Sequence, residues 1–563
     1  MTKYALGLDF GTGSVRALLV DLRNGRELAT SVFNYRCGKE GVLTDPKDPD
    51  VARQHPKDYL DGLEQCVRGC LAVARKHKGF DAGDVIGIGV DTTGSTPIPV
   101  NADGQPLVFS KRFARNLNAM AWLWKDHSSH DEAAEITELA QRMHPEYLAK
   151  CGGTYSSEWF FSKILHCLRV DREVFGAAAI WVELADFIPA YLTGNTRPDR
   201  VVRGVCAAGH KAMYNPEWGG LPEKAFLAKL DARLGDLRDR LYAEAVPADR
   251  RAGELAPDIA RKLGLRPGIA VAVGAFDAHM GAVGAGIRPG TLVKIIGTST
   301  CDMMVAPGDS RLPDIPGLCG IVKGSILPDA YGLEAGQSAV GDIFNWFVEH
   351  LVPPAYYGRR GAKADVHAAL TRRAARLKPG QCGLLALDWN NGNRTILVDP
   401  RLCGLLLGQT LHTEAHEVYR ALIEATAFGA LVIIERFEQY GVPVREIVAC
   451  GGIAEKNPLL MQIYANVTGR RMKISRSGQT CALGAAMFGA TAAGHFPNVE
   501  AAQDALCGLK PKVYEPMSEQ HTVYERLFRL YRDLHDAFGT KSFSKNLHHV
   551  MKELMSIRDA ARG

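Results

Sequence analysis

The chain has 563 residues, 46% of them hydrophobic and 23% charged, which are ordinary values for globular proteins. This length predicts at least two domains, because a single core rarely extends beyond about 250–300 residues. Lysine and arginine exceed aspartate and glutamate by 67 − 62 = 5, too weak a bias to indicate nucleic-acid binding. None of the 13 cysteines forms a CxxC pair, which favours a reducing compartment over a disulfide framework or zinc site.

The N-terminal and apolar segments do not resemble targeting or membrane sequences. Asp9 interrupts the first apolar stretch, which argues against a secretory signal peptide. The longest apolar run, residues 268–287, contains Asp277 and His279 near its middle, and a membrane span would rarely do so. We therefore expect a cytoplasmic protein that has no membrane partner.

Strands and helices alternate along the chain in a pattern typical of α/β proteins. The expected elements are, in chain order, a hairpin over the first twenty residues, a helix at about 56–77, a strand at 85–91, a short helix near 259–263, a strand at 269–277, a hairpin at 291–306, a helix at about 414–440, a strand at 447–452 and an amphipathic helix at 519–538.

The two expected hairpins share a Gly-Thr turn, at residues 11–14 and 297–300, and lie about half the chain apart. This repetition suggests two related halves that each begin with the same hairpin. Glycine and proline gather at residues 286–290, directly before the second hairpin. We therefore expect two domains, 1–288 and 289–563.

Several enzyme classes are excluded by missing motifs. The chain contains no GxxxxGK[ST], HExxH or GxSxG, so P-loop enzymes, zincins and typical α/β hydrolases are not expected. The glycines at 281–286 do not have the GxGxxG spacing of a dinucleotide-binding loop.

The first hairpin carries the pattern of a phosphate site. Asp9 ends its first strand, and the N–H groups of the Gly-rich turn at 11–14 could cradle phosphates. The carboxylate could hold Mg²⁺ through water, and Arg16 could reach a phosphate. The turn at 297–300 offers the same arrangement, and two such turns could bracket a triphosphate. The alternative for each turn is a plain hairpin.

Two acidic residues and a glycine pair stand out in the remaining strands. Asp277 lies in an apolar segment, which favours a general base over the alternative of a helix N-cap. Asp91 also ends a strand, but its polar neighbours favour a turn. The glycines at 451–452 could let an adenine or ribose lie on the backbone, or could simply form a sharp turn. Asn457 is expected to cap a helix that begins at Pro458.

Taken together and in this order, these segments resemble the FGGY carbohydrate kinases, relatives of hexokinase, actin and the heat-shock chaperone ATPases. The resemblance covers residues 4–494 and rests on LGLDFGTGSVRALLVD, VDTTGSTPIPV, VGAFDAH, IIGTSTCD, GLEAGQSAVGD, ALDWNNGNRT and CGGIAEKNPLLMQ. It implies an α/β fold of two ribonuclease-H-like lobes of the actin and hexokinase type, with mixed sheets and an interdomain cleft.

The same resemblance implies an activity and the ligands that it needs. The motifs VDTTGSTP, YSSEW, AGHK, GTSTCD and EAGQSA are most similar to those of family members that act on L-ribulose. The implied reaction is ATP-dependent, Mg²⁺-assisted phosphorylation of L-ribulose to L-ribulose 5-phosphate, as part of L-arabinose degradation.

The resemblance also implies the role of individual residues. Asp277 matches the catalytic base, and Asp9 matches the acidic residue near Mg²⁺. The residues expected at ATP are Thr12, Gly13, Ser14, Arg16, Gly297, Thr298, Gly341, Asn345, Gly451, Gly452 and Asn457. The residues expected at the ketose are Gly94, Lys211, Asp277 and Glu334.

One signature departs from the family, and two other functions stay open. His166 stands where the family usually has tryptophan, so no role is assigned to Lys163. The alternatives are a kinase for D-ribulose or xylulose, and a non-catalytic ATP-binding switch of the actin or chaperone type. Asp277 and the ketose residues favour an enzyme over a switch. No nucleic-acid partner is expected, and a homodimer stays possible.

Overall fold

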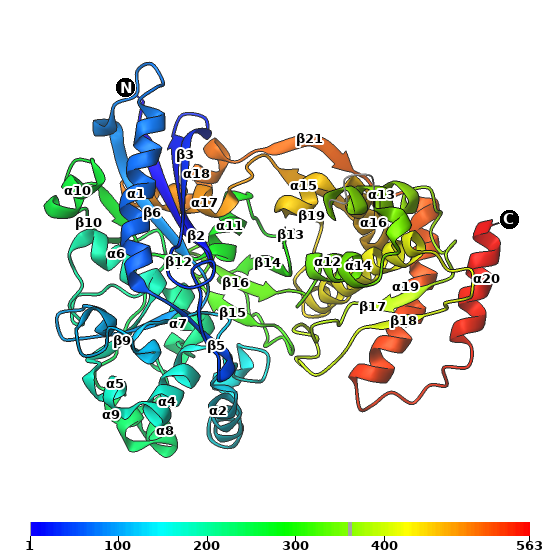
Figure 1. The fold of residues 1–563 in the computed structure, drawn as a ribbon, viewed down its shortest axis with the longest axis horizontal. Coiled ribbons are helices and arrows are strands. Elements are labelled where there is room, and N and C mark those ends of the chain that lie inside the picture. Colours follow the sequence, from blue (N-terminus) through cyan, green and yellow to red (C-terminus); the bar gives the residue numbers. More distant parts are fainter. Residues whose placement is uncertain (1, 358–362, 563) are drawn as a thin grey trace.

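The computed structural model describes residues 2–357 and 363–562, and each half of the chain is built around a sheet of mixed direction (Figure 1). The first sheet has the order β10-β11-β6-β1-β2-β3, with β12 paired to β6. Its strands are β1 Tyr4–Phe10, β2 Ser14–Asp21, β3 Arg26–Asn34, β6 Val85–Thr92, β10 Arg251–Glu254, β11 Ala270–Ala272 and β12 Ala275–Phe276. The elements around this sheet form the first lobe.

The second sheet has the order β15-β16-β14-β13-β19-β20-β21, and the elements around it form the second lobe. Its strands are β13 Thr291–Ile296, β14 Thr300–Pro307, β15 Gly320–Lys323, β16 Ala330–Ala335, β19 Glu446–Cys450, β20 Arg471–Ser475 and β21 Leu509–Tyr514.

Both sheets repeat one topology. In the first lobe, β1, β2 and β3 form an antiparallel meander, and β6 and β11 extend the sheet in parallel with β1. In the second lobe, β13, β14 and β16 are paired antiparallel in the same spatial order, with the additional strand β15 between β14 and β16 in the chain and paired outside β16, and β19 and β20 run parallel to β13. This arrangement confirms the predicted α/β fold of two ribonuclease-H-like lobes, and it confirms both predicted hairpins.

All four helices in that series of expected elements are also present. They are α1 Pro56–Ala74, α10 Pro257–Leu263, α14 Ala415–Gln439 and α19 Ser518–Gly539. Helix α1 packs on β2 and β3, where its stripe of buried side chains covers one face of the first sheet.

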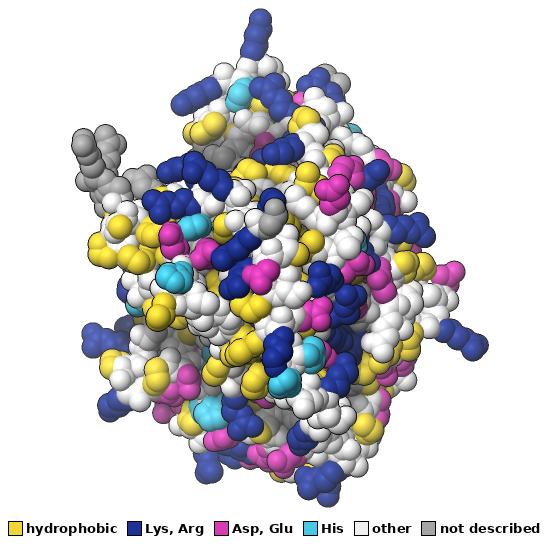
Figure 2. Space-filling view, turned by 90° about the vertical axis from the view of Figure 1, so that its right-hand side faces the viewer, with side chains coloured by type: hydrophobic (Ala, Val, Ile, Leu, Met, Phe, Trp, Pro, Cys, Tyr) yellow, Lys and Arg dark blue, Asp and Glu magenta, His cyan; other side chains and the backbone are white. Residues whose placement is uncertain are grey.

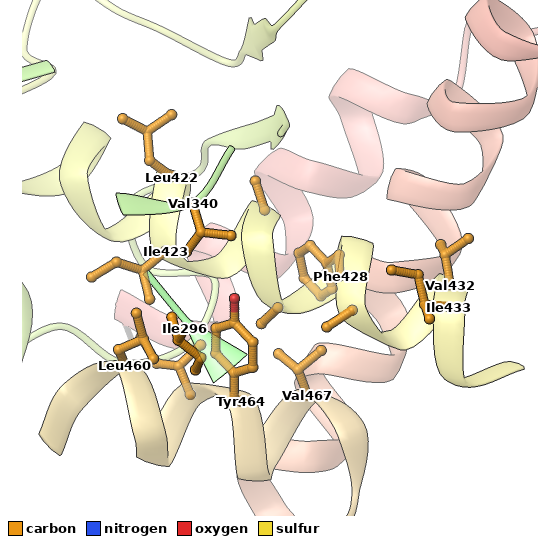
Figure 3. Packing of buried hydrophobic residues seen from close by; sticks show 14 of the residues in the cluster. Ile296, Val340, Leu422, Ile423, Phe428, Val432, Ile433, Leu460, Tyr464 and Val467 are labelled. Atoms are coloured by element: carbon orange, nitrogen blue, oxygen red, sulfur yellow. The ribbon is translucent and has the colours of Figure 1, made fainter. Parts of the chain in front are cut away.

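The core of the second lobe lies directly behind the second Gly-Thr turn. Figure 3 shows Ile296 and Val340 among the apolar side chains of α14 and of α16, which spans Pro458–Thr468. Both residues are fully buried. Because Ile296 directly precedes Gly297 and Val340 directly precedes Gly341, packing in this core fixes where both glycines lie.

Two local expectations were wrong. The strand expected at 269–277 is interrupted between β11 and β12, and Asp277 begins helix α11, Asp277–Gly284. A Cβ at Gly274, inside the interruption, would overlap the carbonyl oxygen of Ala185 in α6, Leu184–Thr193. The strand expected at 447–452 ends at Cys450, because the short helix α15, Gly452–Lys456, precedes the helix that Asn457 caps.

One helix joins the two lobes. Helix α17, Thr480–Ala492, lies in the chain between β20 and β21 of the second sheet but packs on β1 and β6 of the first (Figure 1). A Cβ at Gly7 or Gly89 would overlap carbonyl oxygens of α17, and one at Gly284 of α11 would do the same. Glycine alone lets these backbones approach so closely.

Side chains of both charge signs are mixed on the end face of the second lobe. Figure 2 views the second lobe end-on and shows lysine and arginine side chains interspersed with acidic and histidine side chains. Among the described residues, no helix is both long enough and apolar enough to cross a membrane.

Candidate active site

Three aspartates gather at neighbouring strand ends of the first lobe. The parallel strands β1 and β6 place Asp9 beside Asp91, and β12 pairs with β6 just before Asp277. Asp91 is fully buried, and neither of its carboxylate oxygens has a hydrogen-bond partner among the described residues. The expectation that Asp91 belongs to a turn was therefore wrong, because the residue lies within strand β6.

The three carboxylates do not ionise independently. Burial raises the pKa of Asp277 to about 7, and the nearby Asp9 carboxylate adds to the rise. Burial also raises the pKa of Asp9, although the Arg16 guanidinium opposes this. Burial, Asp9 and Asp277 together raise the pKa of Asp91 well above its ordinary value. Asp277 therefore exchanges its proton near neutral pH, where a general base works best.

Asp277 begins a helix but does not take its N-cap position. It is the first residue of α11, and Phe276 takes the N-cap position without a side-chain cap. Oδ1 of Asp277 accepts a hydrogen bond of 2.6 Å from the Ala278 N–H. The residue is only half-buried.

The first Gly-Thr turn is closed by its own backbone and tied to the first lobe. The Gly11 N–H donates to the Ser14 carbonyl at 2.9 Å. The Thr12 carbonyl accepts from Gln54 Nε2 at 2.6 Å, and Thr12 Oγ1 accepts from Trp124 Nε1 at 3.0 Å. These bonds fix the turn from outside and leave its residues half-exposed.

Gly13 in this turn and Arg16 on the following strand β2 differ from what the sequence suggested. Gly13 does not have a positive φ, so its conformation alone does not demand glycine. Arg16 extends to Asp9 on the facing strand, where Nη1 lies 3.2 Å from Oδ2. Its guanidinium is thus paired with the acidic cluster, and about a third of its side chain stays exposed.

The second Gly-Thr turn is joined to the start of α12, Gly341–His350. The Gly297 N–H donates to Ser299, and the Val340 N–H donates to the Thr298 carbonyl at 2.7 Å. The Gly341 N–H donates to the Gly297 carbonyl at 3.1 Å, and a Cβ on Gly341 would come within 2.6 Å of that oxygen. The structure therefore brings three of the predicted nucleotide residues into contact.

The remaining predicted nucleotide residues lie around the end of β19. Gly451 has a φ of 98°, and a Cβ there would overlap the Ile296 carbonyl oxygen. A Cβ on Gly452 would meet open space. Asn457 caps α16 as expected, because its Oδ1 accepts from a backbone N–H at 3.1 Å. Asn345 is exposed on α12.

The predicted ketose residues meet across the two lobes. Nζ of Lys211, at the end of α7 (Val205–Lys211), lies 3.5 Å from Oε2 of Glu334 on β16. The ammonium also lies 5.3 Å from the Trp159 ring centroid and 5.8 Å from that of Phe276. A Cβ on Gly94 would lie 4.0 Å from Lys211 Cε. Lysine and glutamate thus form a polar pair beside the base.

Mutual attraction keeps this pair charged. Burial opposes ionisation of Glu334, but the Lys211 ammonium holds the pKa of Glu334 well below its ordinary value. Burial acts to lower the pKa of Lys211, but the Glu334 carboxylate raises it overall. A charged donor and a charged acceptor are therefore both available to sugar hydroxyls.

Sequence reasoning missed several side chains near this pair. Arg394 Nη2 donates to the Thr300 carbonyl at 2.6 Å, and its charge acts on Glu334. Lys163 is fully buried and donates to the Ser95 and Leu123 carbonyls at 2.8 Å. Lys163 therefore holds the loop that contains Gly94. The signal for Arg394 was the NGNR sequence in the segment ALDWNNGNRT.

Two further missed residues, His210 and His279, are sequence neighbours of Lys211 and Asp277. His166, which stands at the family's tryptophan position, contacts Glu132, and its Nδ1 lies 3.0 Å from Oε2 of that residue. The whole arrangement combines a carboxyl whose pKa lies near neutrality, a charged Lys211–Glu334 pair and two Gly-Thr turns.

Models of known protein families match most of this chain. Residues 4–284 match the N-terminal domain of the FGGY family of carbohydrate kinases, and residues 292–493 match its C-terminal domain. The ribulokinase of Halalkalibacterium halodurans is 43% identical over 572 residues, covering 99% of this chain and 98% of that protein. The ribulokinase of Mycolicibacterium smegmatis is 42% identical, with 95% and 94% covered.

Solved structures share the fold at lower identity. The xylulose kinase of Rhodospirillum rubrum has a TM-score of 0.76 at 23% identity, with 95% of this chain and 99% of that chain covered. The ADP complex of Plasmodium falciparum glycerol kinase has a TM-score of 0.74 at 15% identity, with 95% and 98% covered. These likenesses concern the fold alone.

Proposed function

The chain belongs to the FGGY family of carbohydrate kinases, and we propose that it transfers the γ-phosphoryl group of ATP to the 5-hydroxyl of L-ribulose. Relatives named ribulokinase that are 42–43% identical over almost the whole chain support this substrate. The observation that carries the proposal is the Lys211–Glu334 pair beside Asp277. The product, L-ribulose 5-phosphate, would serve L-arabinose degradation in the cytoplasm.

Each group then has a chemical task. Asp277 accepts the hydroxyl proton while the ketose oxygen attacks the γ-phosphorus in line. Lys211 donates to sugar hydroxyls, and Glu334 accepts from them. The N–H groups of Gly11, Gly297 and Thr300 already donate to backbone carbonyls, so the other N–H groups of the turns at 11–14 and 297–300 donate to phosphate oxygens. Charge developing in the transition state then meets fixed dipoles.

The acidic cluster fits a hard divalent cation. Asp91 has two fully buried oxygens without partners among the described residues, and the Asp9 carboxylate lies beside it on the neighbouring strand. Oxygen ligands of this kind suit Mg²⁺, so Asp9 and Asp91 would hold the ion, directly or through water. When bound, Mg²⁺ supplies positive charge that offsets the charge of the phosphates.

The nucleotide would lie along the second lobe. The free face of Gly452 and the positive φ of Gly451 support an adenosine site on this backbone, with Asn345 on α12 at its edge. Asn457 already uses its Oδ1 in capping, which leaves its amide N–H groups for the nucleotide.

A coupled assay with the four 2-ketopentoses tests this function. With ATP and Mg²⁺, L-ribulose should give the highest kcat/KM. A higher kcat/KM for D-ribulose or a xylulose would identify that sugar as the substrate instead. ATP hydrolysis at a rate that none of the four sugars changes would favour the non-catalytic switch.

Lys211→Ala should raise KM for the sugar and leave ATP affinity nearly constant, whereas equal losses would make Lys211 structural. Light scattering would show whether the protein is a homodimer.

A further inference from the structure

Two buried histidines lie against the Lys211–Glu334 pair without an assigned task. His210 precedes Lys211 on α7, and His279 lies on α11. Their Nε2 atoms are 3.0 Å apart, and Nδ1 of His210 lies 3.5 Å from Oε2 of Glu334. His210 Nδ1, His279 Nδ1 and Glu334 Oε2 are buried and have no hydrogen-bond partner among the described residues. Such a group of unsatisfied atoms calls for a ligand-linked explanation.

Chemistry selects one arrangement of the imidazole protons. Burial lowers the pKa of His279 to about 4, and burial together with His279 lowers the pKa of His210 well below its ordinary value. Both rings are therefore neutral at pH 7, and each carries one N–H. A proton on His210 Nδ1 faces the Glu334 carboxylate, whereas the other tautomer turns a lone pair toward it.

With the proton on Nδ1, the Nε2 of His210 is an acceptor, and His279 Nε2–H is positioned to donate to it. Ser325 Oγ also lies 3.1 Å from His210 Nε2 and 3.0 Å from the Val322 carbonyl, so its hydroxyl can turn its proton toward the lone pair on Nε2. The result is a directed chain from His279 through His210 to Glu334.

The neighbouring strand leaves room for this chain. Gly320 on β15 stands directly opposite Glu334 on β16, and a Cβ there would overlap His210 Nδ1. A Cβ on Gly209 would likewise overlap the Val322 side chain. Two glycines, one from each lobe, thus allow an imidazole of the first lobe to reach a carboxylate of the second.

A metal ion is the competing use of these three side chains, since one ligand atom from each lies within 4.8 Å of the others. Two features oppose it. Lys211 Nζ lies 3.5 Å from the same Oε2, so its charge would repel a cation. His279 Nε2 lies 3.9 Å from Glu334 Oε2 but only 3.0 Å from His210 Nε2, the nitrogen that does not face Glu334, so a cation among the three side chains would have to displace that closer contact.

We propose that His210 and His279 are positioning residues, a pair of neutral imidazoles that holds Glu334 Oε2 so that Oε1 meets a hydroxyl of the ketose. The inference rests on the proposed sugar site. The 3.5 Å contact is longer than an ordinary hydrogen bond, as polar contacts in unliganded sites often are, and it shortens when the sugar binds. The series of contacts from His279 through His210 to Glu334 crosses between the lobes. The Glu334 carboxylate is therefore oriented only when α7 of the first lobe contacts β15 of the second.

The first test separates KM from kcat. His210→Leu removes the donor to the charged Glu334, so KM for the ketose should rise about 10–100-fold, whereas kcat and KM for ATP should change by less than about threefold. His210→Asn keeps an N–H near the Nδ1 position and should stay within about threefold of wild type. Gly320→Ala should resemble His210→Leu, because it displaces the ring without removing a polar group.

The matched control is Gly176→Ala, since a Cβ at this exposed helical glycine would meet nothing within 4 Å. It should leave every constant unchanged. Equal rises in KM for ATP and ketose, or a His210→Asn variant as poor as His210→Leu, would make His210 structural and overturn the inference.

The second test asks whether His279 acts through His210. His279→Leu should raise KM for the ketose less than His210→Leu does. The double variant should be no worse than His210→Leu alone, because the chain is already broken. Independent, additive effects would show that His279 acts on its own.

A third measurement does not need turnover. In the ¹⁵N-histidine NMR spectrum of the full chain, assigned with His210→Asn and His279→Gln, both rings should be neutral, with the proton on Nδ1 of His210 and Nε2 of His279. A cationic ring, or His210 protonated on Nε2, overturns the inference whatever the substrate is. A wild-type protein that phosphorylates none of the ketopentoses overturns only the proposed function.

Discussion

The hairpins β1–β2 and β13–β14 have the same Gly-Thr turn and the same place in their sheets, but they carry their charges differently. In the first, Asp9 and Arg16 form a partly exposed pair of 3.2 Å beside the turn. In the second, Lys294 and Asp302 form a buried pair of 2.8 Å, and Lys294 also donates to Gln337 at 2.9 Å. The residue two places before the turn is Asp9 in one hairpin and Ile295 in the other.

This difference shows how one topology serves two tasks. A half-exposed pair next to a substrate site exchanges its partner at little cost, because water screens both charges. A pair with no exposed surface is fixed, because separating it would leave a charge unpaired in the interior. The proposed function therefore assigns reactive groups to the first hairpin and a rigid frame for phosphates to the second.

The largest effect is expected at Asp277, the proposed general base, in the first lobe. Asp277→Asn should lower kcat by about 10²–10⁴, the usual range for a lost general base. Its fold and nucleotide binding should persist, because the amide can still accept from Ala278. Steady-state kinetics together with calorimetric binding of a non-hydrolysable ATP analogue measure this. A folded variant that keeps more than about a tenth of the wild-type kcat would refute the role.

The buried pair of the second hairpin should matter for stability. Lys294→Met leaves Asp302 buried and unpaired, which should cost about 3–5 kcal/mol in the free energy of unfolding. Arg16→Met should cost less than about 1 kcal/mol, because its pair is partly exposed. Urea unfolding compares the two variants. As a control, Lys294→Met with Asp302→Leu should recover much of the loss, and equal losses from Lys294→Met and Arg16→Met would erase the distinction between the hairpins.

The turns themselves should differ in what they tolerate. Gly13→Val places a branched side chain where phosphate must approach, so affinity for an ATP analogue should fall by roughly 1.5–3 kcal/mol, about 10–150-fold. Folding should survive, because Gly13 has no positive φ and its nearest neighbour, the Glu40 carbonyl oxygen, would lie 3.4 Å from a Cβ.

Calorimetric titrations with the analogue and with L-ribulose measure the change, and sugar affinity should hardly move. The matched control is Ser299→Val, at a position of the second turn that already carries a side chain, where the loss should be smaller. A Gly13→Val protein that binds the analogue as tightly as wild type would reduce the first turn to a plain hairpin.

The smallest expected effect is the change in kcat/KM for each unit of pH. Asp277 must be deprotonated to act, and its pKa is about 7, so kcat/KM should fall about tenfold for each pH unit below 7. The pKa of Glu334 is lowered and that of Lys211 is raised, so the sugar-binding pair stays charged through this range. Asp277→Asn should lack this limb. A wild-type profile that stays flat down to pH 5 would contradict the assignment.

Local patterns predicted most of the fold. Both hairpins follow from turn residues between apolar strands, and the helix cap at Asn457 follows from its neighbour Pro458. The position of Asp277 in an apolar segment was also visible in the sequence, although the residue is only half-buried. Each of these signals lies within about ten residues, the range over which turn chemistry and periodicity operate.

The features that escaped prediction depend on distant partners. The break at Gly274 exists because α6 passes there, and the burial of Asp91 depends on β1 and α17, which come from both ends of the chain. The contact of His210 with Glu334 needs both lobes. No pattern within one segment encodes such meetings, so the site's residue types were predictable, but their contacts were not.

The packing of α17 on the first sheet also affects how this protein is made. β1 and β6 leave the ribosome long before α17 has been synthesised, and until then the glycine-rich face at Gly7 and Gly89 has nothing to cover it. Uncovered strands of this kind invite aggregation in nascent chains. The lobe that is translated first is therefore finished only when nearly the whole polypeptide exists, so order of synthesis and order of completion are reversed.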